Sequence, residues 1–192
     1  ISNESGCTIS GNNISNLSQT SGTIDVFGIS CGATAVTTTS FTGTDNPNVT
    51  ISNNTIGVVT HLNTYSSIGI YFGGSTTGIN TISNNSIYGV GGKPTGGDFT
   101  AGILISGVAG SMTNIYYNSI SLTGTFTGGN EKMYGIAIGG SNPTVDIRNN
   151  AIANSQVNGT GVNYGIGLGY ATYTNLTLDY NNITSTGQFG GT

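Results

Sequence analysis

Short stretches of alternating apolar and polar residues run along the whole chain. The alternation is clear at residues 135–138 (Gly-Ile-Ala-Ile), 145–147 (Val-Asp-Ile) and 176–178 (Leu-Thr-Leu). A period of two predicts β-strands with one buried face. Helix is disfavoured, because the Gly, Asn, Thr and Ser residues that surround these stretches are poor helix-interior residues. We therefore expect an all-β fold of short strands joined by glycine-rich loops.

The strands belong to a repeat built on the motif Ile-Ser-Asn-Asn-Thr-Ile of residues 51–56. Related motifs occupy residues 9–14, 82–87, 115–120, 147–152 and 178–183. One position is asparagine in every copy: Asn12, Asn54, Asn85, Asn118, Asn150 and Asn181. Successive asparagines lie 31 to 33 residues apart after a first step of 42. A nearly fixed period of this size is typical of solenoid proteins.

A second motif, Gly-Ile-x-apolar, falls between the asparagine motifs and keeps pace with them. Its copies begin at Gly28, Gly69, Gly102, Gly135 and Gly165. Each unit then has three short strands: one at the Gly-Ile motif, one before the asparagine and one after it. This is one coil of a parallel β-helix, whose backbone pairs with the coils above and below. We expect the asparagines to adopt left-handed turns and form an internal ladder, and the glycines to occupy corners needing free φ.

The two motifs together resemble the repeats of right-handed parallel β-helix proteins. These are the pectate-lyase-like repeats of polysaccharide-active enzymes and of large bacterial surface proteins and adhesins. The resemblance covers about residues 7–183 and implies the right-handed sense of the helix. It says little about function, because this fold carries lyases, hydrolases, adhesins and passive stalks.

We predict a single domain over residues 1–192, with about five to six coils of about 31–33 residues. The longer first step places an inserted, protruding loop at residues 32–48. Neither end of the sequence shows a capping segment. We therefore expect a segment of a longer protein, or a fibre subunit that associates end to end into a filament.

Charge is scarce: three basic and seven acidic residues give a net charge of −4. Three cations leave no electrostatic footprint for phosphates, which argues against a nucleic-acid partner. No apolar run reaches the ~18 residues of a membrane span, and no cofactor or metal motif is present. The Asn/Thr/Gly-rich composition favours a secreted or cell-surface protein. Secretion would permit a disulfide between Cys7 and Cys31, with two buried free thiols as the alternative.

The candidate catalytic residues are acids in the loops before the Gly-Ile strands. Asp98 and Glu131 each lie four residues before their glycine, so we expect them to stack on adjacent coils. Paired carboxylates can hydrolyse a glycosidic bond, and Lys93 and Lys132 in the same loops would also suit a lyase. The alternative is a solvated loop edge with a weak ion pair.

The candidate recognition residues are outward aromatic and charged side chains. Tyr116, Arg148 and Asp179 hold the same repeat position, so we expect one outward column on successive coils. Tyr71 is predicted to face outward from its Gly-Ile strand. Such residues can bind sugars or a partner surface, or simply support the stack by cross-strand pairing.

These observations favour an extracellular structural or adhesive rod without catalysis: a stalk, a fibre unit or a surface adhesin presenting a carbohydrate or cell-surface ligand. A polysaccharide-active lyase or hydrolase, or a carbohydrate-binding module, is the alternative. An ice-binding β-helix is a third possibility, although neither the face before the asparagine pair nor the Gly-Ile face carries a regular threonine array.

Overall fold

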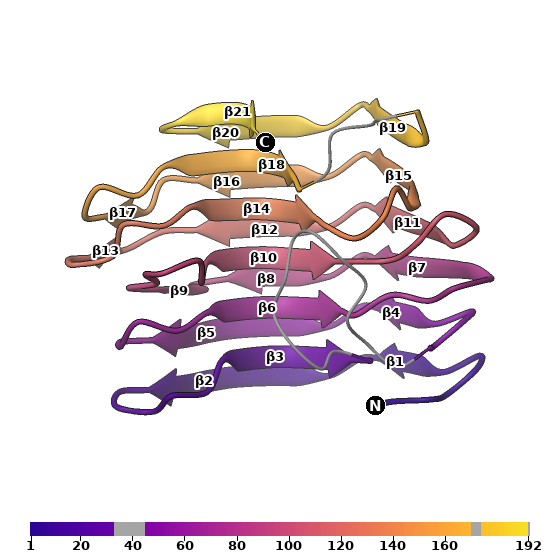
Figure 1. Cartoon of the computed structure of the whole chain (residues 1–192), viewed down its shortest axis with the longest axis horizontal. Coiled ribbons are helices and arrows are strands. Elements are labelled where there is room, and N and C mark those ends of the chain that lie inside the picture. The colour runs from indigo at the N-terminus through magenta and orange to yellow at the C-terminus, as the bar shows by residue number, and fades with distance from the viewer. Residues whose placement is uncertain (33–44, 170–173, 192) are drawn as a thin grey trace.

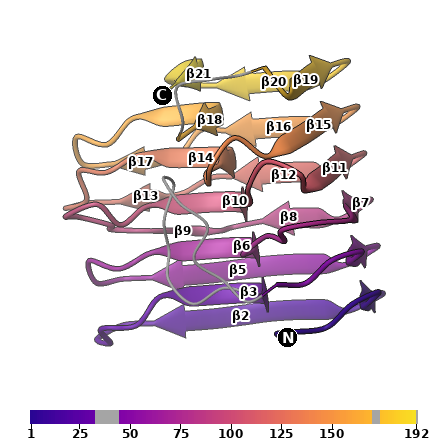
Figure 2. The same ribbon diagram turned by 45° about the vertical axis from the view of Figure 1, so that its right-hand side comes forward.

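The computed structural model describes residues 1–32, 45–169 and 174–191, the last four by their backbone alone. The chain forms a parallel β-solenoid, a rod of stacked coils (Figures 1 and 2). The described residues contain strands and turns without helices, so none of their elements is a helix able to cross a membrane. The all-β solenoid fold predicted from the repeat is confirmed. Most of the loop predicted at 32–48 lies outside the described residues.

Three parallel sheets form the sides of the rod, and every named strand pairing is parallel. Sheet 1 contains β1 (Thr8–Ser10), β4 (Thr50–Ser52), β7 (Ile79–Ser83), β11 (Met112–Tyr116), β15 (Thr144–Arg148) and β19 (Leu176–Asp179). Sheet 2 contains β2 (Asn13–Gln19), β5 (Thr55–His61), β8 (Ser86–Tyr88), β12 (Ser119–Leu122), β16 (Ala151–Asn154) and β20 (Asn182–Ser185), with β9 (Gly91–Gly92) paired to β5. Sheet 3 contains β3 (Val26–Cys31), β6 (Ser67–Phe72), β10 (Thr100–Ile105), β14 (Met133–Ile138), β18 (Asn163–Leu168) and β21 (Gln188–Gly191). A small fourth sheet pairs β13 (Thr125–Phe126) with β17 (Val157–Asn158).

One strand from each principal sheet makes a coil, and we number the coils 1 to 6 from the N-terminal end. The register places equivalent repeat positions side by side: Ile51 pairs with Ile82, and Ile115 pairs with Ile147. The sequence repeat is therefore the coil itself, and parallel hydrogen bonds between coils link each copy of the motif to the next.

The core consists of apolar columns that run along the inside of the rod. Sheet 1 contributes Ile51, Ile82, Ile115 and Ile147, and sheet 2 contributes Ile56, Ile87, Ile120 and Ile152, all at most 2% exposed. The Ile residues of the Gly-Ile motifs face them from sheet 3. The period-two pattern thus selects which side chains leave water, and burial of each isoleucine stabilises the rod by about 1.5–3 kcal/mol.

The glycines of the Gly-Ile motif do not serve the purpose expected from the sequence. Gly28, Gly69, Gly102 and Gly135 are absent from the positions with positive φ. A Cβ at Gly102 would instead lie 2.6 Å from Cγ2 of Ile120 and 2.7 Å from the carbonyl oxygen of Gly135. The repeat therefore needs glycine because the sheet 2 isoleucine and the next coil fill the space a side chain would take.

The turn between sheets 1 and 2 uses two residues for two different tasks. The first residue of the turn has positive φ: Gly11, Asn53, Asn84, Tyr117, Asn149 and Tyr180. The repeated asparagine follows it and has no positive φ, contrary to expectation. Left-handed geometry therefore falls on the more variable position of the motif, where Gly and Asn adopt it at least cost.

The repeated asparagines form the internal ladder predicted from the sequence. Nδ2 of Asn85 donates to Oδ1 of Asn118 at 2.9 Å, and the backbone N–H of Asn85 donates to the same oxygen at 3.0 Å. Nδ2 of Asn85 also donates back to the carbonyl of Ile51 at 3.0 Å. The same side-chain bonds recur from Asn12 to Asn181. Each inner asparagine therefore ties together three consecutive coils.

A strained residue interrupts the second strand of coil 2. Val58 has a φ of 56°, a left-handed conformation that is a genuine outlier for a β-branched residue. The flanking strands carry Asn16 and Gly89 at the corresponding place, with φ of 60° and 63°. The bend is thus a feature of three coils, and valine is the residue least suited to it.

Val58→Asn is expected to raise the free energy of unfolding by about 1 kcal/mol, because it relieves the left-handed strain. Little apolar burial is lost, since Val58 is 39% exposed. Urea denaturation measures the change. The matched control is Val59→Asn next to it, which should destabilise strongly because Val59 is fully buried. A loss of stability in Val58→Asn would show that the bend is not strained.

Candidate functional site

The two acids singled out from the sequence occupy equivalent positions on adjacent coils. Asp98 lies two residues before Thr100 and Glu131 two before Met133, and Thr100 pairs with Met133. Oδ1 of Asp98 accepts a hydrogen bond from the Ser66 hydroxyl at 2.7 Å. Oε1 of Glu131 accepts one from the backbone N–H of Gly97 at 3.0 Å. Each carboxylate thus bonds to the coil on its N-terminal side.

A second partner of Asp98 is Asp25, an acid that the sequence analysis did not single out. Asp25 accepts a hydrogen bond from the backbone N–H of Ser66 at 2.9 Å, so both carboxyl groups converge on Ser66. Burial raises the pKa of Asp25, the Ser66 N–H lowers it, and the nearby Asp98 carboxylate raises it further. The structure therefore holds a carboxyl pair, Asp25 and Asp98, across coil 2.

Asp25→Asn is expected to stabilise the chain near neutral pH, by about 0.5 kcal/mol for a half-exposed charge. The folded pKa of Asp25 lies above its ordinary value of 3.8. The folded chain then binds more protons than the unfolded chain between these two pKa values, so stability falls as pH rises through that window. Well below pH 3.8, both states are protonated and the variant should gain nothing. Thermal unfolding at several pH values tests this; a pH-independent gain would contradict the assigned cause.

The candidate lysines lie in the same loops but make different contacts. Nζ of Lys132 lies 5.9 Å from the ring centroid of Tyr164, a cation–π contact. The backbone N–H of Lys93 donates to the carbonyl of His61 at 3.2 Å, which joins coils 2 and 3. A salt bridge joins Arg148 and Asp146 on sheet 1.

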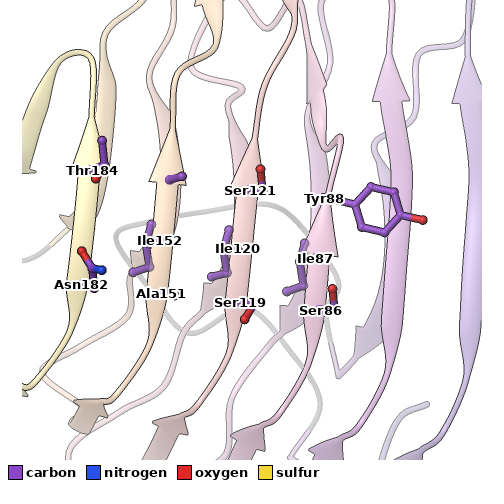
Figure 3. A pocket seen from close by; sticks show the side chains of 11 residues that line it. Ser86, Ile87, Tyr88, Ser119, Ile120, Ser121, Ala151, Ile152, Asn182 and Thr184 are labelled. Atoms are coloured by element: carbon purple, nitrogen blue, oxygen red, sulfur yellow. The ribbon is translucent and has the colours of Figure 1, made fainter.

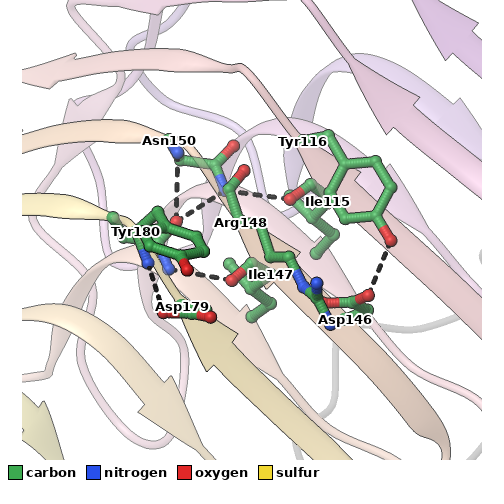
Figure 4. Close-up of polar contacts among 9 residues, drawn as sticks. Ile115, Tyr116, Asp146, Ile147, Arg148, Asn150, Asp179 and Tyr180 are labelled. Atoms are coloured by element: carbon green, nitrogen blue, oxygen red, sulfur yellow. Dashed lines mark hydrogen bonds and ion pairs between the residues drawn. The ribbon is translucent and has the colours of Figure 1, made fainter.

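The outward column on sheet 1 is present as predicted. Tyr116 pairs with Arg148, and Arg148 pairs with Asp179. Asp146, two residues before Arg148, completes the cluster: it accepts from the Tyr116 hydroxyl at 2.7 Å and from Nε of Arg148 at 2.6 Å (Figure 4). Asp179 instead accepts from the backbone N–H of Tyr180 at 3.0 Å.

The protonation states in this cluster favour a structural role, in which its hydrogen bonds hold adjacent coils together, over a role in acid–base catalysis. Desolvation and the hydrogen bond to Asp146 raise the pKa of Tyr116 to about 12. The hydrogen bond to Asp146 and its charge also raise the pKa of Arg148. Near neutral pH the phenol therefore stays a donor and the guanidinium stays charged, so neither group exchanges protons there.

Tyr71 was expected on the surface, and this expectation is wrong. Its side chain is fully buried within a second apolar cluster, with Ile68, Leu104 and Ala137. The ring centroid of Phe27 lies 5.7 Å away. The alternation along sheet 3 does place Tyr71 opposite the inner columns, but that side also carries a packed apolar layer.

Cys7 and Cys31 are free thiols in the structure, so the disulfide expected as one of two alternatives is not formed. Both side chains belong to the apolar core: Cys31 is fully buried and Cys7 packs against the same cluster. Burial raises the pKa of the Cys31 thiol to about 11. The thiolate is the reactive form, so Cys31 behaves near neutral pH as a small apolar residue.

The outer face of sheet 2 is a shallow trough of about 300 Å³ across coils 3 to 6 (Figure 3). Small side chains line it in two rows: Ser86, Ser119, Ala151 and Asn182 in one, and Ser121, Ala153 and Thr184 in the other. Tyr88 closes one end, with its ring over Gly57, where a Cβ would come within 2.3 Å of the ring. The period-two pattern after each asparagine predicts that these residues face outward. It does not mark them as a site, because small side chains suggest no particular chemistry.

A smaller and more polar recess of about 210 Å³ lies where coil 5 turns from sheet 2 to sheet 3. Amide side chains line it: Gln156, Asn158 and Asn163, which are 2%, 2% and 5% exposed. Thr186 and Gly187 of coil 6 form one wall. This recess could hardly be predicted from the sequence, because Asn is abundant throughout the loops. The useful signal is the alternation at 154–158, where amides take inward positions.

In the part of the chain described, no cluster of three or more His, Cys, Asp or Glu side chains could hold a metal ion. Comparison with known proteins adds no relative: no family model, no curated protein and no solved structure matches the chain. The candidate sites are therefore judged from their geometry alone.

Proposed function

We propose that the chain is a structural or adhesive rod module of a secreted bacterial surface protein, built as a right-handed β-helix of the pectate-lyase-like repeat type. The observation that supports this proposal is the state of the two ends of the rod. Among the described residues, coils 1 and 6 each leave apolar columns and ladder groups without a further coil, and the groups of coil 1 complement those of coil 6.

The hydrogen bonds between the asparagines of the ladder all run in one direction along the rod. Among the coils described, the terminal asparagines in coils 1 and 6 lack one of the two ladder neighbours. From Asn12 to Asn150, the backbone N–H of each ladder asparagine donates to Oδ1 of the next one toward the C-terminus. Within the described chain, the backbone N–H of Asn181 therefore lacks the Oδ1 acceptor that Asn150 has. Oδ1 of Asn12 correspondingly lacks its donors. A donor end and an acceptor end of the same ladder can join head to tail.

The apolar columns are open at the same places. Ile9 and Ile14 in coil 1 pack against the core but are only partly buried. In coil 6, Ile183 is only partly buried and Leu178 is 48% exposed. The equivalent Ile82 and Ile87 in coil 3 are each 1% exposed. A further coil at either end would bury this apolar surface and pair the strand edges, which are otherwise a pairing hazard.

The occupant we propose is a second copy of the chain, stacked coil 6 against coil 1. The contact joins two different surfaces, so it does not close on itself and extends into a filament. The rod would then act as a stalk or fibre that holds its loops and outer faces away from a cell surface.

Sedimentation velocity from micromolar to near-millimolar concentration tests this function. We expect the unaltered chain to grow in size with concentration. Ile14→Glu, which places a charge on the open column, should remain monomeric. The matched control Ser121→Glu, exposed in the middle of the rod, should still associate. A strictly monomeric unaltered chain, or association unaffected by Ile14→Glu in a folded protein, would overturn the proposal.

A polysaccharide-active enzyme remains the second candidate, and the carboxyl pair of Asp25 and Asp98 is the observation in its favour. Two neighbouring carboxyl groups can act as acid and base on a glycosidic bond. Incubation with pectin, alginate and glucan tests it. Product release that is lost in Asp98→Asn would replace the structural proposal; under the structural proposal we expect no release.

A further inference from the structure

Two exposed tyrosines lie in one row along the corner between sheets 1 and 2, which we call the corner row. Tyr117 and Tyr180 are 59% and 76% exposed. The backbone N–H of Tyr117 donates to the carbonyl of Arg148, and that of Asn149 donates to the carbonyl of Asp179. Tyr117, Asn149 and Tyr180 therefore hold equivalent places on coils 4, 5 and 6, and Asn149 is exposed between the two tyrosines.

Tyrosine is a strained choice at these two turns. Tyr117 and Tyr180 have φ of 56° and 52°, in the left-handed region. Gly and Asn adopt this conformation with the least strain, and the other four coils carry them at the same place: Gly11, Asn53, Asn84 and Asn149. Backbone strain of this kind clusters at binding sites. Because the two rings also bury little surface within the chain, folding does not account for them.

The corner row stays open to solvent in a single chain and in a filament. Tyr117 has the ring of Tyr116 beside it, with the two centroids 6.3 Å apart in an edge-on arrangement, and remains exposed. In the head-to-tail stack, the next copy places Gly11 beside Tyr180, and glycine has no side chain to cover the ring. The row is therefore available to a ligand whether or not the chains stack.

The chemistry and spacing of the corner row favour a sugar chain as its ligand. Each tyrosine presents a flat apolar ring with a hydroxyl group, which suits the C–H face and the hydroxyl groups of a sugar. The tyrosines are two coils apart, about 9.6 Å at the usual strand spacing. A β-1,4-linked glycan presents the same face of every second sugar unit at a similar repeat. Asn149 then lies beside the intermediate unit, where its amide can both donate and accept.

Two other classes of ligand fit the corner row less well. A stable protein interface buries about 800 Å² on each partner, whereas two tyrosine side chains supply only about 150–250 Å² each. An acidic polysaccharide meets unfavourable charge, because Arg148 is paired with Asp146 and Asp179 adds a carboxylate beside Tyr180 (Figure 4). A neutral, narrow and extended chain avoids both difficulties.

We propose that Tyr117, Asn149 and Tyr180 form a platform that binds a linear neutral β-glycan along the axis of the rod. Alternate sugar units stack on the two tyrosine rings, and the amide of Asn149 bonds to the unit between them. The platform goes beyond the proposed stacking, since one chain carries all three residues.

Affinity electrophoresis of the purified chain in native gels tests the platform, with hydroxyethylcellulose, arabinoxylan and glucomannan as neutral probes and pectate as the acidic one. We expect at least one neutral probe to retard the chain. Tyr117→Asn and Tyr180→Asn should each weaken that binding by about tenfold or more, as loss of a stacked ring predicts. Both variants carry the residue that other coils have at this turn, so they should fold with no loss of Tm.

The matched control is Tyr88→Ser, which removes an exposed tyrosine from sheet 2. Ser121 holds the equivalent place on the next coil, so the substitution suits the strand, and binding should be unchanged. None of the three substitutions alters the net charge. The variants should therefore migrate like the unaltered chain in gels without polysaccharide.

Four outcomes would overturn the inference. They are no retardation by any neutral probe, binding that both corner-row variants retain in full, equal weakening in Tyr88→Ser, and tighter binding of pectate than of every neutral probe. Loss of self-association in Tyr117→Asn, without glycan binding, would also overturn it and make the row a contact between copies. A strictly monomeric chain that binds glycan through the two tyrosines would reject stacking and support the platform.

Discussion

Asn85→Ala is expected to lower the free energy of unfolding by about 3–5 kcal/mol, because several buried groups lose their partners together. Nδ2 of Asn85 donates hydrogen bonds to the carbonyl of Ile51 and to Oδ1 of Asn118. Oδ1 of Asn85 accepts hydrogen bonds from the backbone N–H and from Nδ2 of Asn54. All these groups lie in the interior, where water cannot replace the amide, and denaturant unfolding monitored by circular dichroism measures the loss.

The matched control is Asn12→Ala in coil 1. Asn12 makes the same donations to Asn54 but is exposed, so water can take its place. We expect a loss of about 1 kcal/mol or less. Equal effects in the two variants would mean that the ladder adds nothing beyond a single hydrogen bond, and our explanation of the repeated asparagine would be wrong.

Gly102→Ala is expected to cost about 3 kcal/mol through overpacking. The added methyl group would meet Cγ2 of Ile120 at 2.6 Å and the carbonyl oxygen of Gly135 at 2.7 Å. Neither atom can withdraw easily, because the isoleucine fills a core column and the carbonyl belongs to the next coil's strand. Urea denaturation gives the size of the effect.

A comparison with Gly97→Ala separates collision from backbone strain. Gly97 has a φ of 100° but no atom within 4 Å of an added Cβ. Its substitution therefore adds only strain, which we expect to cost about 1–2 kcal/mol. If Gly102→Ala were the milder of the two, close contact would not explain the repeated glycine.

The fold could be predicted because the repeated residues are those that contact their counterparts on adjacent coils. Asn85, Ile82 and Gly102 touch their own counterparts one coil away, so the same residue is needed at every copy. Such positions show a period in the sequence even when the loops between them differ. Three strands per coil and the asparagine ladder follow from that period, since each landmark must return to the same side of the rod.

Two features could not be predicted from the sequence: the reason for the repeated glycine and the burial of Tyr71. Both depend on how tightly the side chains pack and on contacts between residues that are not repeat counterparts. A space too small for a Cβ and a corner with free φ both require glycine. At Gly102 the packing and the backbone φ show that the first reason applies. Tyr71 sits on the outer side of its strand as alternation requires, but it is buried in a cluster with apolar neighbours on the same face of sheet 3. Alternation gives the side of a strand that a residue faces and does not give how deeply it is packed there.

The candidate sites were hidden for a related reason. Asp25 meets Asp98 across an intervening coil, but the two acids lie one repeat position apart, since Val26 pairs with Ser67 and Ser67 with Thr100. A search for acids at equivalent positions therefore misses the pair. The recess of coil 5 is lined by neutral amide side chains. In a chain this rich in asparagine, the residue type alone does not mark such a place.

The central proposal, head-to-tail stacking of coil 6 on coil 1, predicts a specific register. The sheet 2 pairings align Ser121 with Ala153 and Ala153 with Thr184 at one end, and Ser15 with Gly57 at the other. In a stack that continues this register, Thr184 of one copy lies beside Ser15 of the next, about 4.8 Å apart. That spacing suits a disulfide.

The most direct test introduces Thr184→Cys and Ser15→Cys together in a Cys7→Ser background; the buried Cys31 thiol is unreactive. The two positions lie at opposite ends of the rod, so a bond between them must join two molecules. We predict a ladder of disulfide-linked oligomers on non-reducing gels for this pair, and little for the out-of-register pair Thr184→Cys with Ser18→Cys. Absence of linked oligomers, or equal linking in both pairs, would contradict end-to-end stacking.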